Sequence, residues 1–282
     1  MLNVVVLSEN HSNCSLKGEP GLSLFVNFNG YKFLFDTGAS DLFIQNAKKL
    51  GIDVEDVDNV VISHGHSDHT NGIKFLQMEK RIIAHPAIFK ERYSMKERQY
   101  AGFPMSEKAL RSKHNVFLTS EPNEFTPNIW FLGEIPMTVD FEKNGYYSTT
   151  LDDEYRIQDK TEDDSGIVFV TPKGLIVFTG CGHKGICNTI EYAKKVTGKS
   201  QVYAVLGGFH LKNLEAKKPV IDQTIDYLKR NRIRNLYLGH CIDDDVINYM
   251  QEKMPSAKIN RLAVGKMFDI ELSKEENLAE KL

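Results

Sequence analysis

Short apolar runs and amphipathic segments alternate along most of the chain. Runs rich in Val, Ile, Leu and Phe have the length of buried strands and cover residues 2–7, 22–28, 32–35, 60–62, 81–84, 167–171, 175–179, 202–206 and 236–238. Apolar positions three and four apart predict helices at residues 41–50, 186–196, 220–230 and 243–254, before two short strands and a polar tail. Strands with helices between them predict an α/β fold.

The two halves of the chain repeat one pattern. Asn29-Gly30 joins one pair of strands and Pro172-Lys173-Gly174 joins another, and both are turn sequences typical of hairpins. Each hairpin ends in Thr-Gly, and a helix and strands that end in histidine come next. We therefore predict two sheets sandwiched between helices, with the strand ends meeting at one edge, where such folds place chemistry.

The composition is that of an ordinary folded protein. The 282 residues are 41% hydrophobic and 26% charged, which excludes a disordered or fibrous chain. The net charge of −3 argues against nucleic-acid or anionic-membrane partners, and four cysteines are too few for a disulfide scaffold. The sequence shows neither a secretion signal nor an apolar run that would cross a bilayer, so we expect a cytoplasmic protein.

A cluster of potential metal ligands directly follows the apolar run at residues 60–62. Three imidazoles and one carboxylate (His64, His66, Asp68 and His69) fall within six residues. These ligand types suit zinc, iron or manganese. His64 and His66 can point to one side of an extended loop, whereas adjacent Asp68 and His69 point to different sides, so one segment could serve two metal ions. The alternative, solvated loop histidines, is disfavoured because a third of the chain's nine histidines gather here.

The chain resembles a member of the metallo-β-lactamase superfamily, whose signature is a strand followed by His-x-His-x-Asp-His. Within the superfamily it is similar to the branch named after dihydropterin-ribofuranosyl-aminobenzene-phosphate synthase. The segments that carry this similarity are Ser63-His64-Gly65-His66, Gly133-Glu134-Ile135-Pro136, Gly180-Cys181-Gly182-His183-Lys184-Gly185-Ile186, Gly207-Gly208-Phe209-His210-Leu211 and Gly239-His240-Cys241.

The resemblance implies an αββα four-layer sandwich with one or two metal ions at the sheet edge. The implied metal ligands are His64, His66, Asp68, His69 and His240. Asp36, in Phe-Asp-Thr-Gly, would fix one imidazole by accepting its other N–H. Zinc is the first expectation for the metal, and iron or manganese are the alternatives.

The sequence departs from the superfamily pattern at Asn71-Gly72, where Gly-Gly is usual, and at two further positions that leave the second metal open. A histidine is expected shortly before residue 167, where the chain has Thr161-Glu162-Asp163-Asp164-Ser165, and Cys181 stands where a bridging carboxylate is expected. Cys181, His183, His210 and Asp164 are the candidates to complete the site. The alternatives are a small buried residue for Cys181, a hydrogen-bonded strand-end residue for His210, and a solvated turn for Asp163 and Asp164, which we prefer for those two. Cys14 and Cys187 are expected to be structural.

Residues 86–160 interrupt the strand and helix rhythm. We interpret them as a lid-like insertion in a single domain that spans residues 1–282. Arg92 and Arg98 lie among aromatic residues, a composition suited to an anionic group attached to a ring. The alternative, slightly favoured, is a solvated amphipathic helix in which these arginines alternate with glutamates.

The leading functional hypothesis is a metal-dependent hydrolase acting on a small, anionic, phosphorylated ester. Hydroxide at the metal would attack the substrate, Asp68 would hold the second metal or orient the nucleophile, and His183 or His210 would polarise the substrate or protonate the leaving group. Three alternatives stay open: phosphoribosyl transfer in pterin cofactor synthesis, a non-catalytic metal-binding sensor or partner protein, and an iron redox site. The sequence leaves the oligomeric state open.

Overall fold

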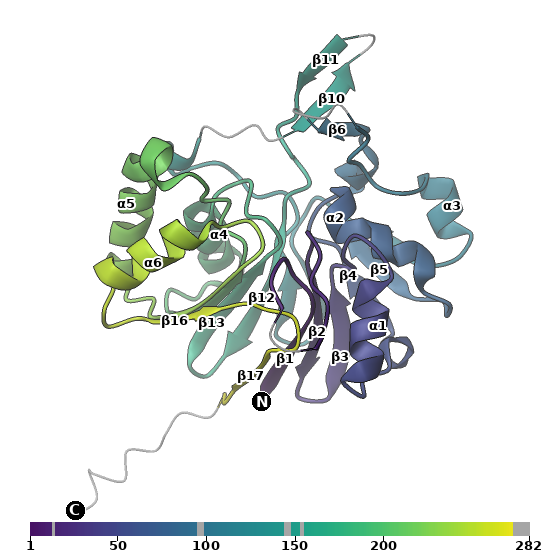
Figure 1. Cartoon of the computed structure of the whole chain (residues 1–282), viewed down its shortest axis with the longest axis horizontal. Coiled ribbons are helices and arrows are strands. Elements are labelled where there is room, and N and C mark those ends of the chain that lie inside the picture. The colour runs from purple at the N-terminus through teal and green to yellow at the C-terminus, as the bar shows by residue number, and fades with distance from the viewer. Residues whose placement is uncertain (13–14, 95–98, 144–147, 153–154, 273–282) are drawn as a thin grey trace, which may run out of the picture.

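Two mixed sheets face each other at the centre of the molecule, and helices cover their outer faces (Figure 1). The structure is a computed structural model that describes residues 1–12, 15–94, 99–143, 148–152 and 155–272, with the backbone alone for 148–157. The predicted αββα sandwich is confirmed. Among the described residues, no helix is both long and apolar enough to cross a membrane.

The first sheet is built mainly from the N-terminal half of the chain. Its strands, in spatial order, are β17 (Met267–Ile270), β1 (Leu2–Ser8), β2 (Ser23–Phe28), β3 (Tyr31–Phe35), β4 (Asn59–Val61), β5 (Arg81–Ala84) and β7 (Asn115–Leu118). Helices α1 (Leu42–Lys49), α2 (Ser67–Thr70) and α3 (Glu107–Arg111) lie on its side of the sandwich (Figure 1). The predicted turn between β2 and β3 is confirmed, because Asn29 and Gly30 both have the positive φ angles that a tight hairpin requires.

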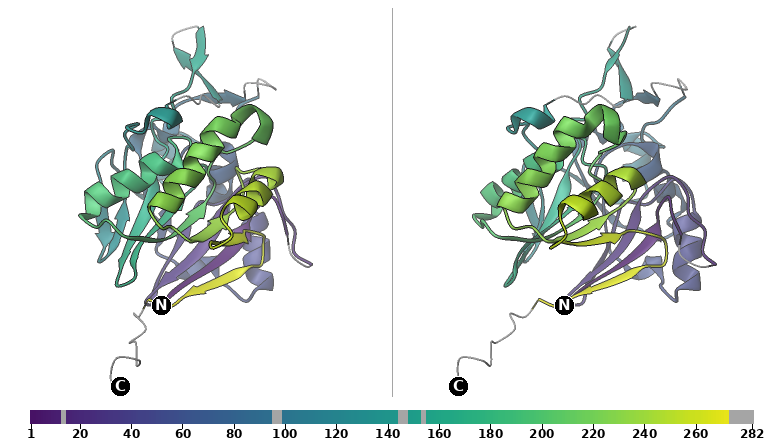
Figure 2. Two further views of the ribbon diagram at one scale, coloured as in Figure 1. Left: turned by 90° about the vertical axis from the view of Figure 1, so that its left-hand side faces the viewer. Right: turned by 60° about the vertical axis from the view of Figure 1, so that its left-hand side comes forward.

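The second sheet is built from the C-terminal half. Its strands, in spatial order, are β16 (Lys258–Arg261), β15 (Asn235–Leu238), β14 (Val202–Gly207), β13 (Gly174–Thr179), β12 (Gly166–Thr171), β9 (Ile129–Phe131) and β8 (Asn123–Thr126). Helices α4 (Ile186–Thr197), α5 (Leu214–Arg230) and α6 (Asp244–Lys253) lie side by side over it (Figure 2). Helix α5 begins six residues before its predicted start because the Asn213 side chain caps it by accepting the Ala216 N–H, and Pro219 lies inside the helix.

The core between the sheets is aromatic and fully closed. Phe33 and Phe35 of the first sheet pack against Phe169 and Phe178 of the second, and all four side chains are completely buried. Separate apolar clusters lie under the helices of each side. This packing holds the two sheets, and the loops at their edges, in fixed positions.

The segment at residues 86–160 is only partly an insertion. Strand β7 extends the first sheet and strands β8 and β9 extend the second, so these parts belong to the sandwich. A separate three-stranded sheet is formed by β6 (Arg92–Ser94), β10 (Ser148–Asp152) and β11 (Tyr155–Gln158), which stands at the top of Figure 1. The described part of residues 90–100 contains a strand, and the alternative of an amphipathic helix there is wrong for Arg92–Ser94.

The parallel strands of both sheets end at the same end of the sandwich, the upper end in Figure 1. Asp36 follows β3, His64 follows β4, Cys181 follows β13, and His240 follows β15. The fold therefore brings together residues that are far apart in the sequence.

Candidate metal centre

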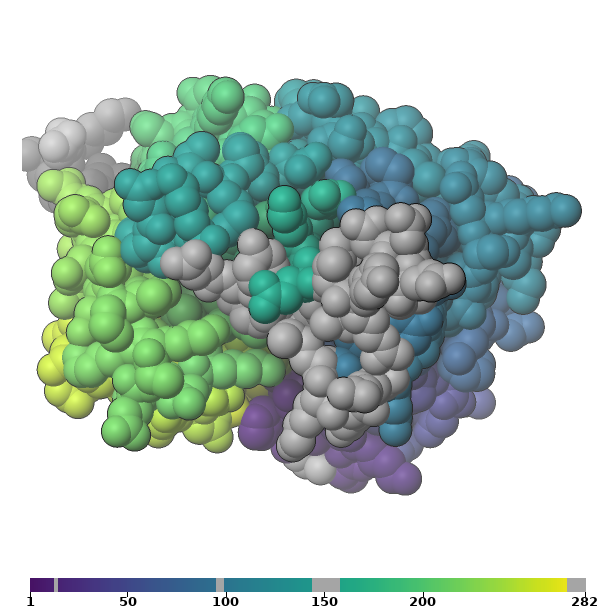
Figure 3. Space-filling view, turned by 90° about the horizontal axis from the view of Figure 1, so that it is seen from above, coloured from purple at the N-terminus to yellow at the C-terminus, as the bar shows by residue number. Residues whose placement is uncertain are grey.

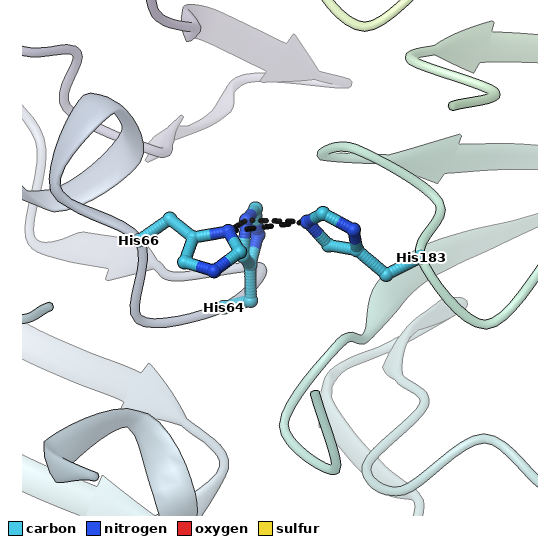
Figure 4. A group of neighbouring side chains, drawn as sticks. All are labelled: His64, His66 and His183. Atoms are coloured by element: carbon cyan, nitrogen blue, oxygen red, sulfur yellow. Dashed lines mark hydrogen bonds between the residues drawn. The ribbon is translucent and has the colours of Figure 1, made fainter. Parts of the chain in front are cut away.

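The first group of metal-ligating atoms consists of His64, His66 and His183 (Figure 4). His64 Nε2 lies 2.9 Å from His66 Nδ1, and His183 Nε2 lies 3.1 Å from the same atom. The first two residues come from the loop after β4, and His183 comes from the loop after β13 on the opposite sheet. His183 thus supplies the third imidazole that the pattern at residues 161–165 lacks.

The second group consists of Asp68, His69 and His240. Nε2 of His69 lies 2.9 Å from Nε2 of His240, and the Asp68 carboxylate lies 3.4 Å from the latter atom. Cys181 Sγ lies 3.2 Å from His69 Nε2 and also forms a group with His64 and His69, so the thiol stands between the two groups.

These donor atoms have the chemistry of a metal site. Burial lowers the pKa of His64 and His183 well below the usual range and that of His66 to about 4, so the three imidazoles are neutral near pH 7. Burial alone would raise the pKa of Asp68, but His69 and His240 lower it and keep the carboxylate ionised. Neutral imidazole nitrogens and a carboxylate that converge in a buried space fit a divalent cation.

Asp36 orients two of the imidazoles through their Nδ1 atoms, which lie on the side of each ring away from the site. Its carboxylate accepts a hydrogen bond from His69 Nδ1 at 2.7 Å and another from the Ser63 hydroxyl at 2.7 Å. The Ser63 hydroxyl in turn lies 2.9 Å from His64 Nδ1. Both rings are therefore held with Nε2 directed to the site, and the structure places Asp36 where the resemblance implied.

The interpretation of Asp163 and Asp164 as a solvated turn is wrong. Both side chains are buried, at 0% and 1% exposure. Asp163 Oδ2 accepts the Gly65 N–H at 2.7 Å, and Asp164 Oδ2 accepts the Lys184 N–H at 2.8 Å. Each aspartate thus anchors one of the two loops that carry the first group, while burial raises the pKa of Asp164 to about 7.

The hypothesis that Arg92 binds the substrate is also wrong. Its side chain is fully buried, and its guanidinium donates to Asp159 at 2.6 Å and to Asp163 at 2.5 Å. Burial would lower the pKa of Arg92, but Asp163 and Asp159 raise it, so the charge is retained inside the protein. Arg98, the other proposed substrate residue, lies outside the described residues.

Three residues near His240 were not anticipated. Glu9 Oε1 accepts the His240 N–H at 2.6 Å, and Asn10 Oδ1 lies 3.0 Å from His240 Nδ1. Cys241 Sγ lies 2.9 Å from Cys181 Sγ. Burial raises the pKa of the Cys181 thiol, whereas the hydrogen bond from Cys181 lowers that of Cys241. The adjacency of Cys241 to His240 was a visible sequence signal, whereas nothing local indicated Glu9 or Asn10.

A cavity of about 200 Å³ adjoins the first group. His183 and His210 form one wall, with their ring centroids 4.6 Å apart, and the remaining wall is mostly apolar with Lys217 and Glu142. Burial lowers the pKa of His210 to about 4, so its ring is neutral near pH 7. In the view from above, the helical region of α5, in green, lies on the opposite side of the molecule from the N-terminal half, in purple to blue (Figure 3).

The comparisons with known proteins agree with this geometry. The Metallo-beta-lactamase superfamily profile matches residues 16–192. The chain belongs to the metallo-beta-lactamase superfamily. Members of this superfamily commonly bind metal ions, and the His, Cys and Asp groups described above are where this chain offers ligands.

The branch predicted from the motifs is confirmed by a relative from Methanocaldococcus jannaschii. This protein, 7,8-dihydropterin-6-methyl-4-(beta-D-ribofuranosyl)-aminobenzene-5'-phosphate synthase, is 32% identical over 286 residues, which cover 94% of this chain and 96% of the relative.

Two solved structures are similar as well. Tm1679, a metal-dependent hydrolase of the beta-lactamase superfamily, has a TM-score of 0.83 at 27% identity and covers 96% of this chain and 99% of its own. Zn²⁺-bound PqqB from Methylobacterium extorquens has a TM-score of 0.56 at 12% identity, with 95% and 100% covered, and this likeness concerns the fold alone.

Proposed function

We propose that this protein is a metal-dependent hydrolase of a small phosphorylated ester. The observation that carries the proposal is the pair of adjacent donor groups, His64, His66 and His183 beside Asp68, His69 and His240. Three imidazoles with room for one further ligand are typical of catalytic metal sites. A bound divalent ion would lower the pKa of its water from 15.7 to about 7 and so supply a nucleophile at neutral pH.

The side chains around the first group have distinct tasks in this reaction. His64, His66 and His183 hold the ion next to the cavity. Asp68 is ionised and its side chain is 37% exposed, so it can orient the attacking water by accepting a hydrogen bond from it. His210, which forms the cavity wall beside His183, is placed to hydrogen-bond the leaving-group oxygen.

The cavity supports a substrate that combines an apolar ring with an anionic group. Phe141, Phe209 and Val220 provide apolar walls, and the Lys217 ammonium provides the cation. The volume of about 200 Å³ suits a small ring system, since pockets for drug-sized ligands are larger. Lys217 therefore replaces Arg92 as the proposed partner of the substrate's negative charge.

The test is removal and return of the metal. Chelated protein should lose hydrolytic activity and regain it with Zn²⁺, Mn²⁺ or Fe²⁺, in a screen of phosphomonoesters, phosphodiesters, lactones and thioesters. His66→Ala should abolish the activity, whereas His11→Ala should not, because His11 is exposed and contacts Arg261. Full activity in His66→Ala would contradict the proposal.

A second candidate is phosphoribosyl transfer in pterin cofactor synthesis. It is favoured by the synthase relative, which is 32% identical over 94% of this chain. Incubation with a phosphoribosyl donor and an aminobenzene acceptor distinguishes the two. Transfer attaches the phosphoribosyl group to the acceptor and releases the donor's leaving group, whereas hydrolysis cleaves the donor with water and leaves the acceptor unchanged. Bound metal without turnover in either assay would instead favour the non-catalytic metal-binding role.

A further inference from the structure

Two buried thiols meet at the second group of ligands, although they come from different strands. Cys181 follows β13 and Cys241 follows β15, and their sulfur atoms lie 2.9 Å apart. Their exposed fractions are 2% and 6%. Cys241 also groups with Cys181 and His240 within metal-ligand distance.

We propose that Cys241 is a metal ligand and that, with Cys181, it makes the second metal position a site of two sulfurs and two nitrogens. The nitrogens are Nε2 of His69 and Nε2 of His240. The inference rests on the metal centre of the proposed function and specifies which atoms build its second half.

The hydrogen bonds behind the two imidazoles support this assignment. Nδ1 of His69 is bound to Asp36 and Nδ1 of His240 to Asn10. A neutral imidazole that donates through Nδ1 carries its lone pair on Nε2, which here points toward the other ring and the thiols. Four donor atoms, one from α2, one from the segment after β13 and two from the segment after β15, thus lie close together.

The two metal positions then differ in kind. Four protein ligands fill the tetrahedral shell that zinc prefers, as in closed structural sites, whereas the three imidazoles of the first group leave a place beside the cavity. Asp68, whose side chain is 37% exposed, is left to accept a hydrogen bond from the attacking water. Thiolates favour zinc, iron or cobalt over manganese, so manganese would occupy the first position alone.

Cobalt substitution tests the inference without reference to activity. The protein is chelated, reloaded with Co²⁺, and examined for the near-ultraviolet band of thiolate-to-cobalt charge transfer. With two thiolates on one ion, Cys241→Ser and Cys181→Ser should each lower the band to about half, and the double variant should lose it. Cys187→Ser is the matched control, because Cys187 belongs to α4 and is buried in the core on the inner side of that helix, so its loss should leave the band unchanged. An unchanged band in Cys241→Ser, or no band in the native protein, would overturn the proposal.

X-ray absorption of the native protein tests the same assignment without any variant, so the result does not depend on whether a cysteine variant folds. With one equivalent of zinc, X-ray absorption should count two sulfur neighbours per zinc ion, and one or none would overturn the proposal. Ester hydrolysis plays no part in either readout. A protein that shows the cobalt band but hydrolyses nothing would contradict the proposed function and leave the ligand assignment standing.

Discussion

The carboxylate of Asp163 joins the buried guanidinium of Arg92 to the metal-binding loop. Its Oδ1 lies 2.5 Å from Arg92 Nη2, and its Oδ2 accepts the N–H of Gly65, the residue between His64 and His66. Gly65 leaves no space for a side chain, since an added Cβ would lie 2.2 Å from the Ile88 carbonyl oxygen. The loop that carries His64 and His66 is thus held in place by the Asp163 carboxylate, which is paired with Arg92, and by close contact of Gly65 with the Ile88 backbone.

Replacing Arg92 should strongly destabilise the protein. Arg92→Met leaves Asp159 and Asp163 buried without their cation, and breaking a buried ion pair in this way costs about 3–5 kcal/mol. Lys90→Met is the matched control because the Lys90–Glu162 pair is about 40% exposed, and such pairs contribute about 0–1 kcal/mol. Urea denaturation measures both. Equal losses in the two variants would show that the buried network adds nothing beyond a surface pair.

The fold and most of the candidate site could be predicted from local patterns. Apolar runs mark the strands, and His64, His66, Asp68 and His69 stand together in the sequence at the end of one of them. The resemblance added Asp36 and His240, which the structure places beside the same imidazoles.

What could not be predicted depends on contacts between distant residues. Asp163 is 71 positions from Arg92, and Cys181 is 60 positions from Cys241, so no local pattern marks either pair. Charged residues near a turn are usually solvated, and the interpretation of Asp163 and Asp164 followed that rule. The two aspartates are buried because they bind partners from distant segments. Asp163 contacts Arg92 of β6 and the Gly65 loop, and Asp164 contacts the Lys184 loop.

Asp163 should matter for metal affinity as well as for stability. Its two oxygens serve different donors, and an amide offers only one acceptor oxygen, so Asp163→Asn must weaken the hold on Gly65 or on Arg92. We expect the affinity of the first metal position to fall about 10–100-fold, as for other groups that orient ligands. Competition with a chromophoric chelator measures the affinity.

The exposed neighbour provides the control for that experiment. Glu162→Gln should keep the native affinity, because Glu162 contacts Lys90 and is partly exposed. The cobalt–thiolate band should persist in Asp163→Asn, since the second position is held by other residues. Native affinity in Asp163→Asn would show that the loop keeps its shape without this anchor.

His114 should contribute to loss of stability in acid. Burial lowers its pKa below the usual 6.5, and its Nδ1 accepts the Lys80 N–H at 3.2 Å, which requires the neutral ring. The unfolded chain therefore binds the proton more readily, so stability is present above pH 6.5 and is lost as the pH falls through the lower folded-state pKa. His114→Asn keeps an acceptor and removes the titration, so its free energy of unfolding should fall less between pH 7.5 and pH 5 than that of the native protein. His11→Asn, at an exposed position, should follow the native curve, and identical curves for all three proteins would refute the role of His114.

Filling the cavity should separate substrate binding from metal binding. Val220→Trp places a large ring in the cavity beside His183 and His210, so KM for a phosphorylated aromatic ester should rise about tenfold or more, which corresponds to roughly 1.4 kcal/mol. Metal content should stay at the native value, because Val220 contributes no ligand. Gln223→Trp on the exposed side of the same helix is the control and should change neither quantity. Steady-state kinetics and metal analysis of both variants decide the matter: an unchanged KM in Val220→Trp would place the substrate elsewhere on this end of the sandwich, while a loss of metal would show that the substitution had disturbed the loop of His183.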